Sequence, residues 1–269
     1  MTEWNTQRVE GLPRIAYDSM GEGPVVVFLH GIGGNRSNWH DQLPAVAAAG
    51  FTAVAWDARG YGGSDDYEGP LDFADFSHDL ARLLDHLGVE HAHLVGLSMG
   101  GRILQDFYPR YRDRVSSLVL CCTFPGFDES FTPEKREEFV RLCRDPLLAG
   151  KAPVDMAPAV ADTLIGPKAT PAHHQRLVDS MALLHKDSYI KTVEATTYYD
   201  RRAVLPEIEA PTLLVFAAGD RLTPPPIGER MAAEIPNSRL VVIPEAGHLV
   251  NIERPQAFND TLLEFLESQ

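Results

Sequence analysis

Short apolar runs recur along the chain, and within each run the apolar residues are consecutive rather than alternating with polar ones. Consecutive apolar residues over the length of a strand predict a strand that is buried on both faces, as in a parallel sheet. The runs lie at residues 25–30, 51–56, 93–97, 115–121, 212–217 and 240–243. Two further segments near the start, 8–11 and 14–17, predict a leading antiparallel hairpin.

Between these runs, apolar residues recur at the spacing of one face of a helix. This spacing predicts helices over 73–87, ending before Gly88, over 103–108, ending before Pro109, and over 258–266. Strands that alternate with helices predict a doubly wound, mostly parallel α/β sheet with helices on both of its faces.

The alternation stops between residues 124 and 202, where prolines separate helical segments and no strand pattern is found. The clearest helical patterns in this segment cover 134–144 and 172–186. We therefore expect a core formed by residues 1–123 and 203–269 and a helical cap formed by 124–202. The alternative is a lateral helical subdomain without contact to the functional site. A cap is favoured because the segment follows the strand after the second predicted helix.

The composition fits a globular protein without nucleic-acid or membrane partners. The chain has 269 residues, of which 44 % are hydrophobic, and this suffices for one large α/β domain or two small ones. A formal net charge of −14 disfavours binding to nucleic acid or to an anionic membrane surface. The first residues contain no basic start and no apolar core, so no secretory signal is predicted, and the apolar runs are too short to span a bilayer.

The chain contains three cysteines, which are Cys121, Cys122 and Cys143. An odd number of cysteines, two of them adjacent, does not fit a disulfide framework. We therefore expect buried thiols in a reducing compartment, and hence a cytoplasmic protein.

A glycine-rich turn around Ser98 is the strongest sign of chemistry in the sequence. Ser98 lies in Gly96-Leu97-Ser98-Met99-Gly100-Gly101, directly after an apolar run and before a predicted helix. A strand that turns sharply into a helix crowds its backbone, and glycines two residues before and after the serine remove the Cβ atoms that would collide. The serine hydroxyl then lies exposed above the N-terminus of the helix, so Ser98 is predicted to be a nucleophile.

A serine hydroxyl needs a base, and the base needs an orienting acid. His248 is the predicted base, because its loop follows the last apolar run and precedes the final helix and can reach the top of the sheet. Asp220 is the predicted acid, because it follows the run at 212–217 and precedes His248. Asp57 also follows a strand and is the competing acid, although its glycine-rich turn favours a structural role.

The negative charge of a tetrahedral intermediate needs hydrogen-bond donors. The N–H of Met99 is predicted to be one donor, since it follows the nucleophile at the start of a helix. The N–H of Ile32 is predicted to be the second, because glycines in the loop at 30–34 let the backbone approach a substrate closely. His30, at the start of this loop, is expected to anchor the loop rather than to transfer protons.

Two glycine clusters suggest nucleotide binding, but neither has the required pattern. In the cluster after His30, the third glycine of G-x-G-x-x-G would fall on Arg36. The cluster at 60–63 is followed by a prolonged loop rather than by a helix. The histidine pairs at 91/93 and 173/174 lack cysteine or acidic partners at metal-ligand spacing. We expect neither a metal nor a cofactor, since hydrolysis by a serine triad needs none.

Taken together, these motifs resemble those of the α/β-hydrolase fold family. The matching segments are the loop at 30–34, the turn at 57–64, the serine turn, Gly219-Asp220, and Gly247-His248 with Glu253 and Pro255 following. They span nearly the whole chain apart from the predicted cap, and in size and motif style the chain is most similar to the 3-oxoadipate enol-lactonase and esterase branch. The resemblance implies an α/β-hydrolase fold and a small-molecule substrate, a carboxylic ester or lactone, that is cleaved through an acyl-serine intermediate.

Two other functions stay open on the same fold. Related hydrolases that cleave carbon–carbon bonds in ring-cleavage products often carry asparagine before the nucleophile, where this chain has Leu97. Other members are non-catalytic ligand receptors that keep an intact triad. A dehalogenase is disfavoured, because dehalogenases of this fold use aspartate where this chain has Ser98.

Residues close in sequence to the site loops are candidates for substrate contacts. A lactone that bears a carboxylate would need a cation nearby, and Arg36 and Arg102 are predicted to supply one. Trp39 is a candidate for the pocket wall. Residues of the cap are expected to set specificity, and assembly into a homo-oligomer is left open.

Overall fold

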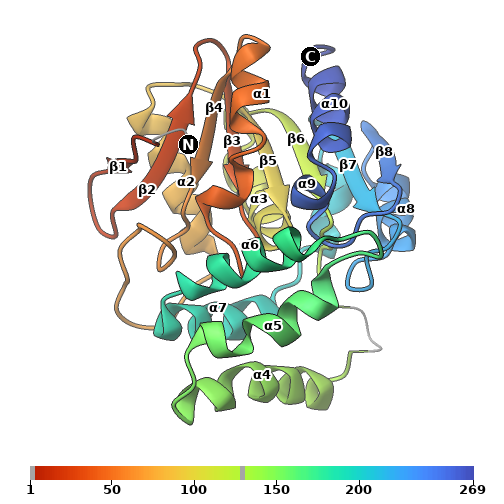
Figure 1. Ribbon diagram of the computed structural model, residues 1–269. Helices are drawn as coiled ribbons and strands as arrows, with labels where there is room; N and C mark the ends of the chain where they lie inside the picture. The colour runs from red at the N-terminus through yellow and green to blue at the C-terminus, as the bar shows by residue number, and fades with distance from the viewer. Residues whose placement is uncertain (1–3, 128–130) are drawn as a thin grey trace.

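The computed structural model describes residues 4–127 and 131–269. Its strands form one eight-stranded sheet in the order β1-β2-β4-β3-β5-β6-β7-β8 (Figure 1). Strands β3 to β8 run parallel to one another, whereas β2 is antiparallel to both β1 and β4. The bounds are β1 (Gln7–Val9), β2 (Ile15–Met20), β3 (Val25–Leu29), β4 (Thr52–Trp56), β5 (Ala92–Leu97), β6 (Val115–Cys121), β7 (Thr212–Ala217) and β8 (Ser238–Ile243). The predicted parallel sheet and its leading hairpin are confirmed.

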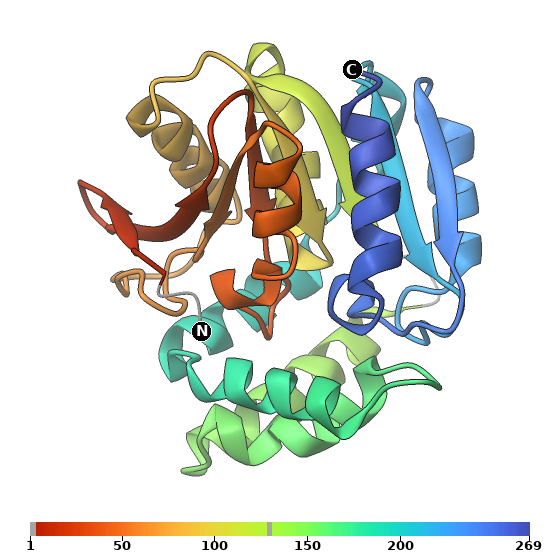
Figure 2. The same cartoon turned by 45° about the horizontal axis from the view of Figure 1, so that its top comes forward.

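Helices cover both faces of this sheet (Figure 2). Helices α1 (Leu43–Ala48) and α10 (Pro255–Leu266) pack together on one face, and α2 (Ala74–His86) and α3 (Met99–Arg110) pack together on the other, which α8 (Pro225–Glu234) also covers. The residues that recur at helical spacing on α2 and α3 face the sheet and are fully buried, namely Phe76, Leu80, Leu83, Leu84, Ile103, Leu104 and Phe107. Burial of these apolar faces stabilises the layered arrangement.

Shorter helical segments complete the connections of the core. They are η1 (Arg36–Trp39), η2 (Arg112–Arg114), η3 (Arg202–Glu207) and α9 (Val250–Glu253). In the described part of the chain, no helix combines the length and the apolar character that crossing a membrane requires.

Among the described residues, four α-helices follow β6 in the chain and precede β7. They lie across the carboxyl ends of the parallel strands (Figure 1). They are α4 (Pro133–Leu148), α5 (Pro153–Leu164), α6 (Pro171–Ala182) and α7 (Lys186–Tyr198). They occupy most of the segment predicted to be a cap, of which residues 128–130 lie outside the described residues. The separation of this segment from the core as a domain stays a prediction.

The structure corrects one expectation within this segment and adds a helix to it. The helix expected over 172–186 is divided, because α6 ends at Ala182 and α7 begins at Lys186. Leu184, between them, forms a β-bridge with Tyr61, so a contact with the core fixes the break. Helix α5 lies between the two segments with the clearest helical patterns. Pro153 lies in the first turn of α5, where the missing N–H would have no helical partner.

A buried carboxylate, Asp57, ties the loop after β4 to the loop after β3. Asp57 is fully buried and accepts hydrogen bonds from the backbone N–H groups of Arg36 at 2.7 Å and Gly63 at 2.6 Å. The guanidinium of Arg36 also contacts Asp57, and its Nε donates to Asp18 at 3.1 Å. Arg36 and Asp57 therefore brace two loops against each other, which agrees with the structural role expected for Asp57.

Replacing Asp57 by alanine is expected to destabilise the fold by about 3 kcal/mol, because it removes one of the two carboxylate partners of the Arg36 guanidinium and the acceptor of two partly buried N–H groups. Urea unfolding measures the loss. The control is Asp65→Ala, which removes the exposed ion pair of Asp65 with Arg14 and should change stability much less. Equal losses in the two variants would contradict the bracing role of Asp57.

Candidate active site

The turn between β5 and α3 holds Ser98 in a strained backbone conformation. Its φ of 53° and ψ of −111° lie in a region that residues with side chains rarely adopt. A Cβ atom added at Gly96 would lie 2.4 Å from the carbonyl carbon of Gly100, and one added at Gly100 would lie 2.2 Å from the carbonyl oxygen of Leu29. Only glycine fits at these two positions, as the predicted sharp turn requires.

Hydrogen bonds from the neighbouring strand hold this turn in place. The N–H of Ser98 donates to the carbonyl of Cys121 at 2.9 Å. The hydroxyl of Thr123 donates to the carbonyl of Ser98 at 2.7 Å. Both partners belong to the end of β6 or the residues just after it. The backbone on both sides of the Ser98 side chain is therefore fixed.

A buried histidine–aspartate pair lies on the two loops that follow β7 and β8. The Nδ1–H of His248 donates to Oδ2 of Asp220 at 2.8 Å, and the two side chains are almost completely buried. A carboxylate accepts only, so this bond leaves the Nε2 atom of His248 as the free nitrogen. The structure thus brings together the predicted base and the predicted acid rather than His248 and Asp57.

Asp220 is held as a carboxylate by its surroundings. Burial alone would raise the pKa of Asp220, but the charge of His248 and hydrogen bonds from His248 and Thr223 hold it well below its usual value. The N–H groups of Leu222 and Thr223 donate to Oδ1 at 2.8 and 3.0 Å, and the Thr223 hydroxyl donates to Oδ2 at 2.5 Å. Asp220 can therefore orient His248 and stabilise its protonated form.

Ser98 and His248 line one small cavity of about 50 Å³, which we call the Ser98 cavity. Its polar side is the loop at residues 31–34, and a Cβ atom added at Gly31 would lie 4.0 Å from the Oγ of Ser98. Its remaining side chains are Ile32, Asn38, Leu97, Leu164, Leu177, Leu222 and Leu249. The described residues that line this cavity include no lysine and no arginine.

The loop at 31–34 is anchored by His30, as the sequence predicts. The N–H of Ala58 donates to Nε2 of His30 at 3.1 Å, and Nδ1 of His30 donates to the carbonyl of Gly31 at 2.8 Å. Burial lowers the pKa of His30, which favours the neutral ring that this pattern needs. Met99 begins α3, so its N–H is among those without an acceptor inside the helix.

The three predicted substrate contacts do not reach the Ser98 cavity. Arg36 is engaged with Asp18 and Asp57, as described above. Trp39 is fully buried in the core, where its ring packs against those of Phe28 at 5.0 Å and Phe258 at 5.9 Å between ring centroids. Proximity in sequence to a site loop does not determine where a side chain points. The side chains of Arg36 and Trp39 contact residues that are distant in the sequence and lie outside the lining of the cavity.

The third of these residues, Arg102, points from α3 toward the end of the cap segment. Its guanidinium is buried and donates to the carbonyls of Thr196 at 2.6 Å and Tyr199 at 3.1 Å. Burial lowers the pKa of Arg102 to about 10. Arg102 therefore joins the core to α7 instead of contacting a substrate beside Ser98.

A contact between the cap segment and the His248 loop was missed by sequence reasoning. The N–H of His248 donates to the carbonyl of Leu164, the last residue of α5, at 2.7 Å. The buried carboxylate of Glu253 accepts from the N–H of Gly166 at 2.8 Å and from that of Gly247 at 3.1 Å. The cap segment thus touches the candidate site, which favours a cap over a lateral subdomain. In the sequence, only the place of Glu253 shortly after His248 hinted at this role.

Cys122, Asp220 and His248 offer ligand atoms that lie within 4.8 Å of one another. Burial, together with Cys121 and Asp220 nearby, raises the pKa of the Cys122 thiol well above its usual value. A protonated thiol is a poor metal ligand, and the Asp220 oxygens already accept hydrogen bonds. The three side chains therefore fit a hydrogen-bonded network better than a metal centre.

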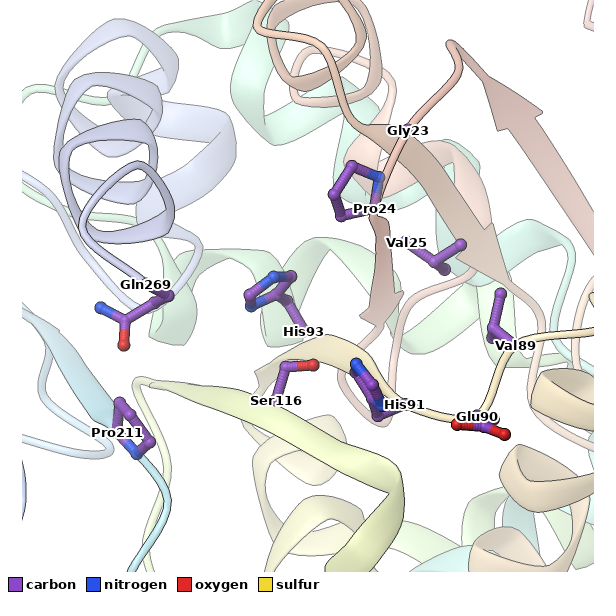
Figure 3. Close-up of a pocket in the computed structure, with 10 residues that line it drawn as sticks. All are labelled: Gly23, Pro24, Val25, Val89, Glu90, His91, His93, Ser116, Pro211 and Gln269. Atoms are coloured by element: carbon purple, nitrogen blue, oxygen red, sulfur yellow. The ribbon is translucent and has the colours of Figure 1, made fainter.

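A larger open hollow of about 710 Å³ lies at the opposite end of the sheet (Figure 3). Its walls include His91 and His93 at the start of β5 and Ser116 at the start of β6. His93 is hydrogen-bonded to Ser117, with 2.8 Å between Nδ1 and Oγ. In parallel sheets, ligands bind at the carboxyl ends of the strands. The smaller Ser98 cavity is at that end, and we take it as the candidate active site.

The chain is similar in sequence to known proteins over most of its length. The chain is 31 % identical to BpoC of Mycobacterium tuberculosis, named as a candidate non-heme bromoperoxidase, over 94 % of this chain and 98 % of the relative. It is 32 % identical to a 2-hydroxy-6-oxononadienedioate/2-hydroxy-6-oxononatrienedioate hydrolase of Paraburkholderia phymatum, over 94 % of this chain and 91 % of the relative.

Solved structures share the fold over almost their whole length. An esterase of Thermogutta terrifontis, solved with malate bound, superposes with a TM-score of 0.90 at 27 % identity and covers 98 % of both chains. An enol-lactonase of Burkholderia xenovorans superposes with a TM-score of 0.84 at 27 % identity, over 95 % of this chain and 97 % of that chain. The predicted resemblance to the enol-lactonase and esterase branch is confirmed. The model of the alpha/beta hydrolase family matches residues 26–261, and the chain belongs to this family.

Proposed function

We propose that the protein is a serine hydrolase that cleaves a small carboxylic ester or lactone through an acyl-serine intermediate. The observation that carries the proposal is the Ser98 cavity, where a strained serine and a histidine held by a buried carboxylate line the same space. A hydroxyl, a base and an orienting acid in this relation are what nucleophilic catalysis by serine requires. The esterase and enol-lactonase among its structural relatives support the same chemistry.

In the proposed reaction, the Oγ of Ser98 attacks the carbonyl carbon of the substrate, and Nε2 of His248 takes the proton of the hydroxyl. Asp220 stabilises the imidazolium that forms. The backbone N–H groups of Ile32 and Met99 donate to the oxyanion of the tetrahedral intermediate. The intermediate collapses when the carbon–oxygen bond breaks and the leaving oxygen takes the proton from His248. Water, deprotonated by His248, then attacks the acyl-serine and releases the carboxylic acid.

The lining of the Ser98 cavity favours a substrate without charge. A carboxylate in an apolar cavity loses its hydration, and this loss needs a cation nearby to offset it. The described lining residues include none, and the net charge of −14 adds an unfavourable field. We therefore favour a neutral ester or lactone over a dicarboxylate such as the one in the name of the Paraburkholderia relative. Carbon–carbon bond hydrolysis is the second candidate, because the chain is 32 % identical to that relative.

The variant Ser98→Ala should lower the turnover of p-nitrophenyl acetate by about 10⁴-fold or more, because it removes the atom that forms the acyl-enzyme. Release of p-nitrophenol measures turnover, and a fluorophosphonate probe should label the wild-type protein but not the variant. The control is Ser116→Ala, at the far end of the sheet, which should retain both activities. Activity in Ser98→Ala, or a wild-type protein that labels once and never turns over, would overturn the proposal.

Asp220→Asn should lower kcat by about 10⁴-fold, because an uncharged amide neither fixes the tautomer of His248 nor stabilises its protonated form. Steady-state kinetics with p-nitrophenyl acetate provide the measurement. Asp57→Asn is the matched variant at the competing carboxylate, and its activity per folded molecule should stay close to that of the wild type. The reverse pattern would assign the acid to Asp57.

Glu253→Gln should lower kcat about 10-fold, because a glutamine can accept only one of the two N–H bonds that fix the His248 loop, and small displacements of a catalytic group slow the reaction. Fluorophosphonate labelling of Ser98 should slow in parallel, since it uses the same base. Glu264→Gln, on the exposed side of α10, is the control and should change neither rate. A lower unfolding temperature with unchanged kcat and labelling would show that Glu253 is structural only.

A further inference from the structure

A second hollow adjoins the Ser98 cavity and is not used by the proposed mechanism. It has a volume of about 260 Å³, and we call it the aromatic cleft. Its lining includes Phe124, Phe127, Phe131, Leu222, Ile227 and Met231. Aromatic and aliphatic side chains make up most of this lining, and the charged residues carry both signs. The cleft therefore suits an apolar, uncharged group better than an ion.

One wall of the cleft is a row of three phenylalanine rings, in which Phe124 meets Phe127 edge to face and Phe127 stacks on Phe131. The ring centroids of Phe124 and Phe127 are 4.9 Å apart, and those of Phe127 and Phe131 are 4.2 Å apart. Behind this wall, the guanidinium of Arg102 lies 4.8 Å from the ring centroid of Phe124 and 4.7 Å from that of Tyr199. A buried cation over aromatic faces stabilises their arrangement. The wall is thus formed before any ligand binds.

One side chain, Leu222, lines both the aromatic cleft and the Ser98 cavity, so the two hollows are neighbours. Its backbone N–H is fixed by the 2.8 Å hydrogen bond to Asp220. Its side chain is 52 % exposed, so it is not locked into the core and can be changed without creating a buried void. The two hollows are therefore neighbouring parts of one site rather than independent depressions.

The sizes of the two hollows imply that the two groups of an ester occupy different hollows. The Ser98 cavity, at about 50 Å³, is much smaller than the aromatic cleft, at about 260 Å³, so it suits the smaller of two groups. An ester carries two groups, one on each side of the reacting bond. Any larger group must lie outside the Ser98 cavity, and the 260 Å³ cleft beyond Leu222 is the adjoining space that can take it.

The position of His248 decides which group enters the cleft. His248 must deliver a proton to the leaving oxygen, so the leaving group lies on the side of the cavity where His248 is held. Asp220, which holds His248, and Leu222, which borders the cleft, belong to the same loop. The acyl group then stays against the loop at 31–34, beside Ser98.

We propose that the aromatic cleft binds the alcohol part of the substrate, an uncharged aryl or alkyl group, while the Ser98 cavity admits only a short acyl group. This inference rests on the proposed function and adds a substrate class to it: acetate-like esters of apolar alcohols. Lengthening the alcohol should be tolerated, whereas lengthening the acyl chain should not.

The test compares kcat/KM for ethyl acetate and 2-phenylethyl acetate, by titration of the released acid, and for p-nitrophenyl acetate and p-nitrophenyl octanoate. We expect the wild-type protein to prefer 2-phenylethyl acetate over ethyl acetate about 10-fold, because the phenyl ring is buried in the cleft. The octanoate should react about 10-fold or more slowly than p-nitrophenyl acetate, because its chain exceeds the Ser98 cavity.

Two substitutions should make the cleft narrower. Leu222→Trp enlarges the side chain that lines both hollows, and Ile227→Trp enlarges a side chain on α8. Each should reduce the preference for 2-phenylethyl acetate over ethyl acetate about 10-fold. Leu142→Trp, at a leucine on α4 that is 66 % exposed and lines neither hollow, is the control and should leave the preference unchanged. Thermal unfolding verifies that all three variants are folded.

The outcomes separate this inference from the proposed function. If the wild-type protein cleaves none of the esters, or if Ser98→Ala still cleaves them, the proposed function fails. If the wild-type protein cleaves acetates through Ser98 but neither tryptophan variant alters the alcohol preference, the cleft does not bind the leaving group. A wild-type preference for the octanoate over the acetate would also overturn the inference.

Discussion

The close approach of three backbone segments around Ser98 is the constraint on which the rest of the site depends. Ser98 adopts a conformation that costs on the order of 1–3 kcal/mol, and such strain persists only where the surroundings enforce it. Here β3, β5 and the first turn of α3 come so close that glycine alone fits at Gly96 and Gly100. The centre of the sheet, the N-terminus of α3 and the position of Ser98 are therefore one structural unit, and they cannot be adjusted separately.

Two aspartates follow parallel strands and are buried, yet their surroundings give them different roles. The charge of Asp57 is matched by the guanidinium of Arg36, which has no proton to exchange in the physiological range. Asp220 instead receives hydrogen bonds from neutral donors and from the imidazole of His248, which can exchange a proton near neutral pH, and it lies beside the Cys122 thiol. Burial alone does not distinguish a carboxylate suited to orient a base from one that braces a loop. The two aspartates differ instead in their partners, which are an arginine for Asp57 and a histidine for Asp220.

The features that could be predicted from the sequence are those that local pattern determines. Consecutive apolar residues predict the strands, and the glycines around Ser98 predict the turn, because both effects act within a few residues. Side-chain direction depends instead on distant partners. Trp39 packs against Phe258 at the other end of the chain, and Arg102 reaches carbonyls of α7, which no local pattern could show. The break between α6 and α7 likewise follows from a bridge of Leu184 to the core.

The contact between the cap segment and the His248 loop limits how a substrate can enter. A Cβ atom added at Gly166 would lie 2.3 Å from the backbone nitrogen of Gly247, so the two segments touch through their backbones. Lifting the cap segment at this place would break the hydrogen bond from His248 to Leu164 and displace the loop that carries the base. Entry beside Leu222 disturbs neither contact, because this half-exposed side chain lies between the two hollows. The same arrangement that fixes the imidazole therefore supports our proposal that part of the substrate lies on the aromatic side.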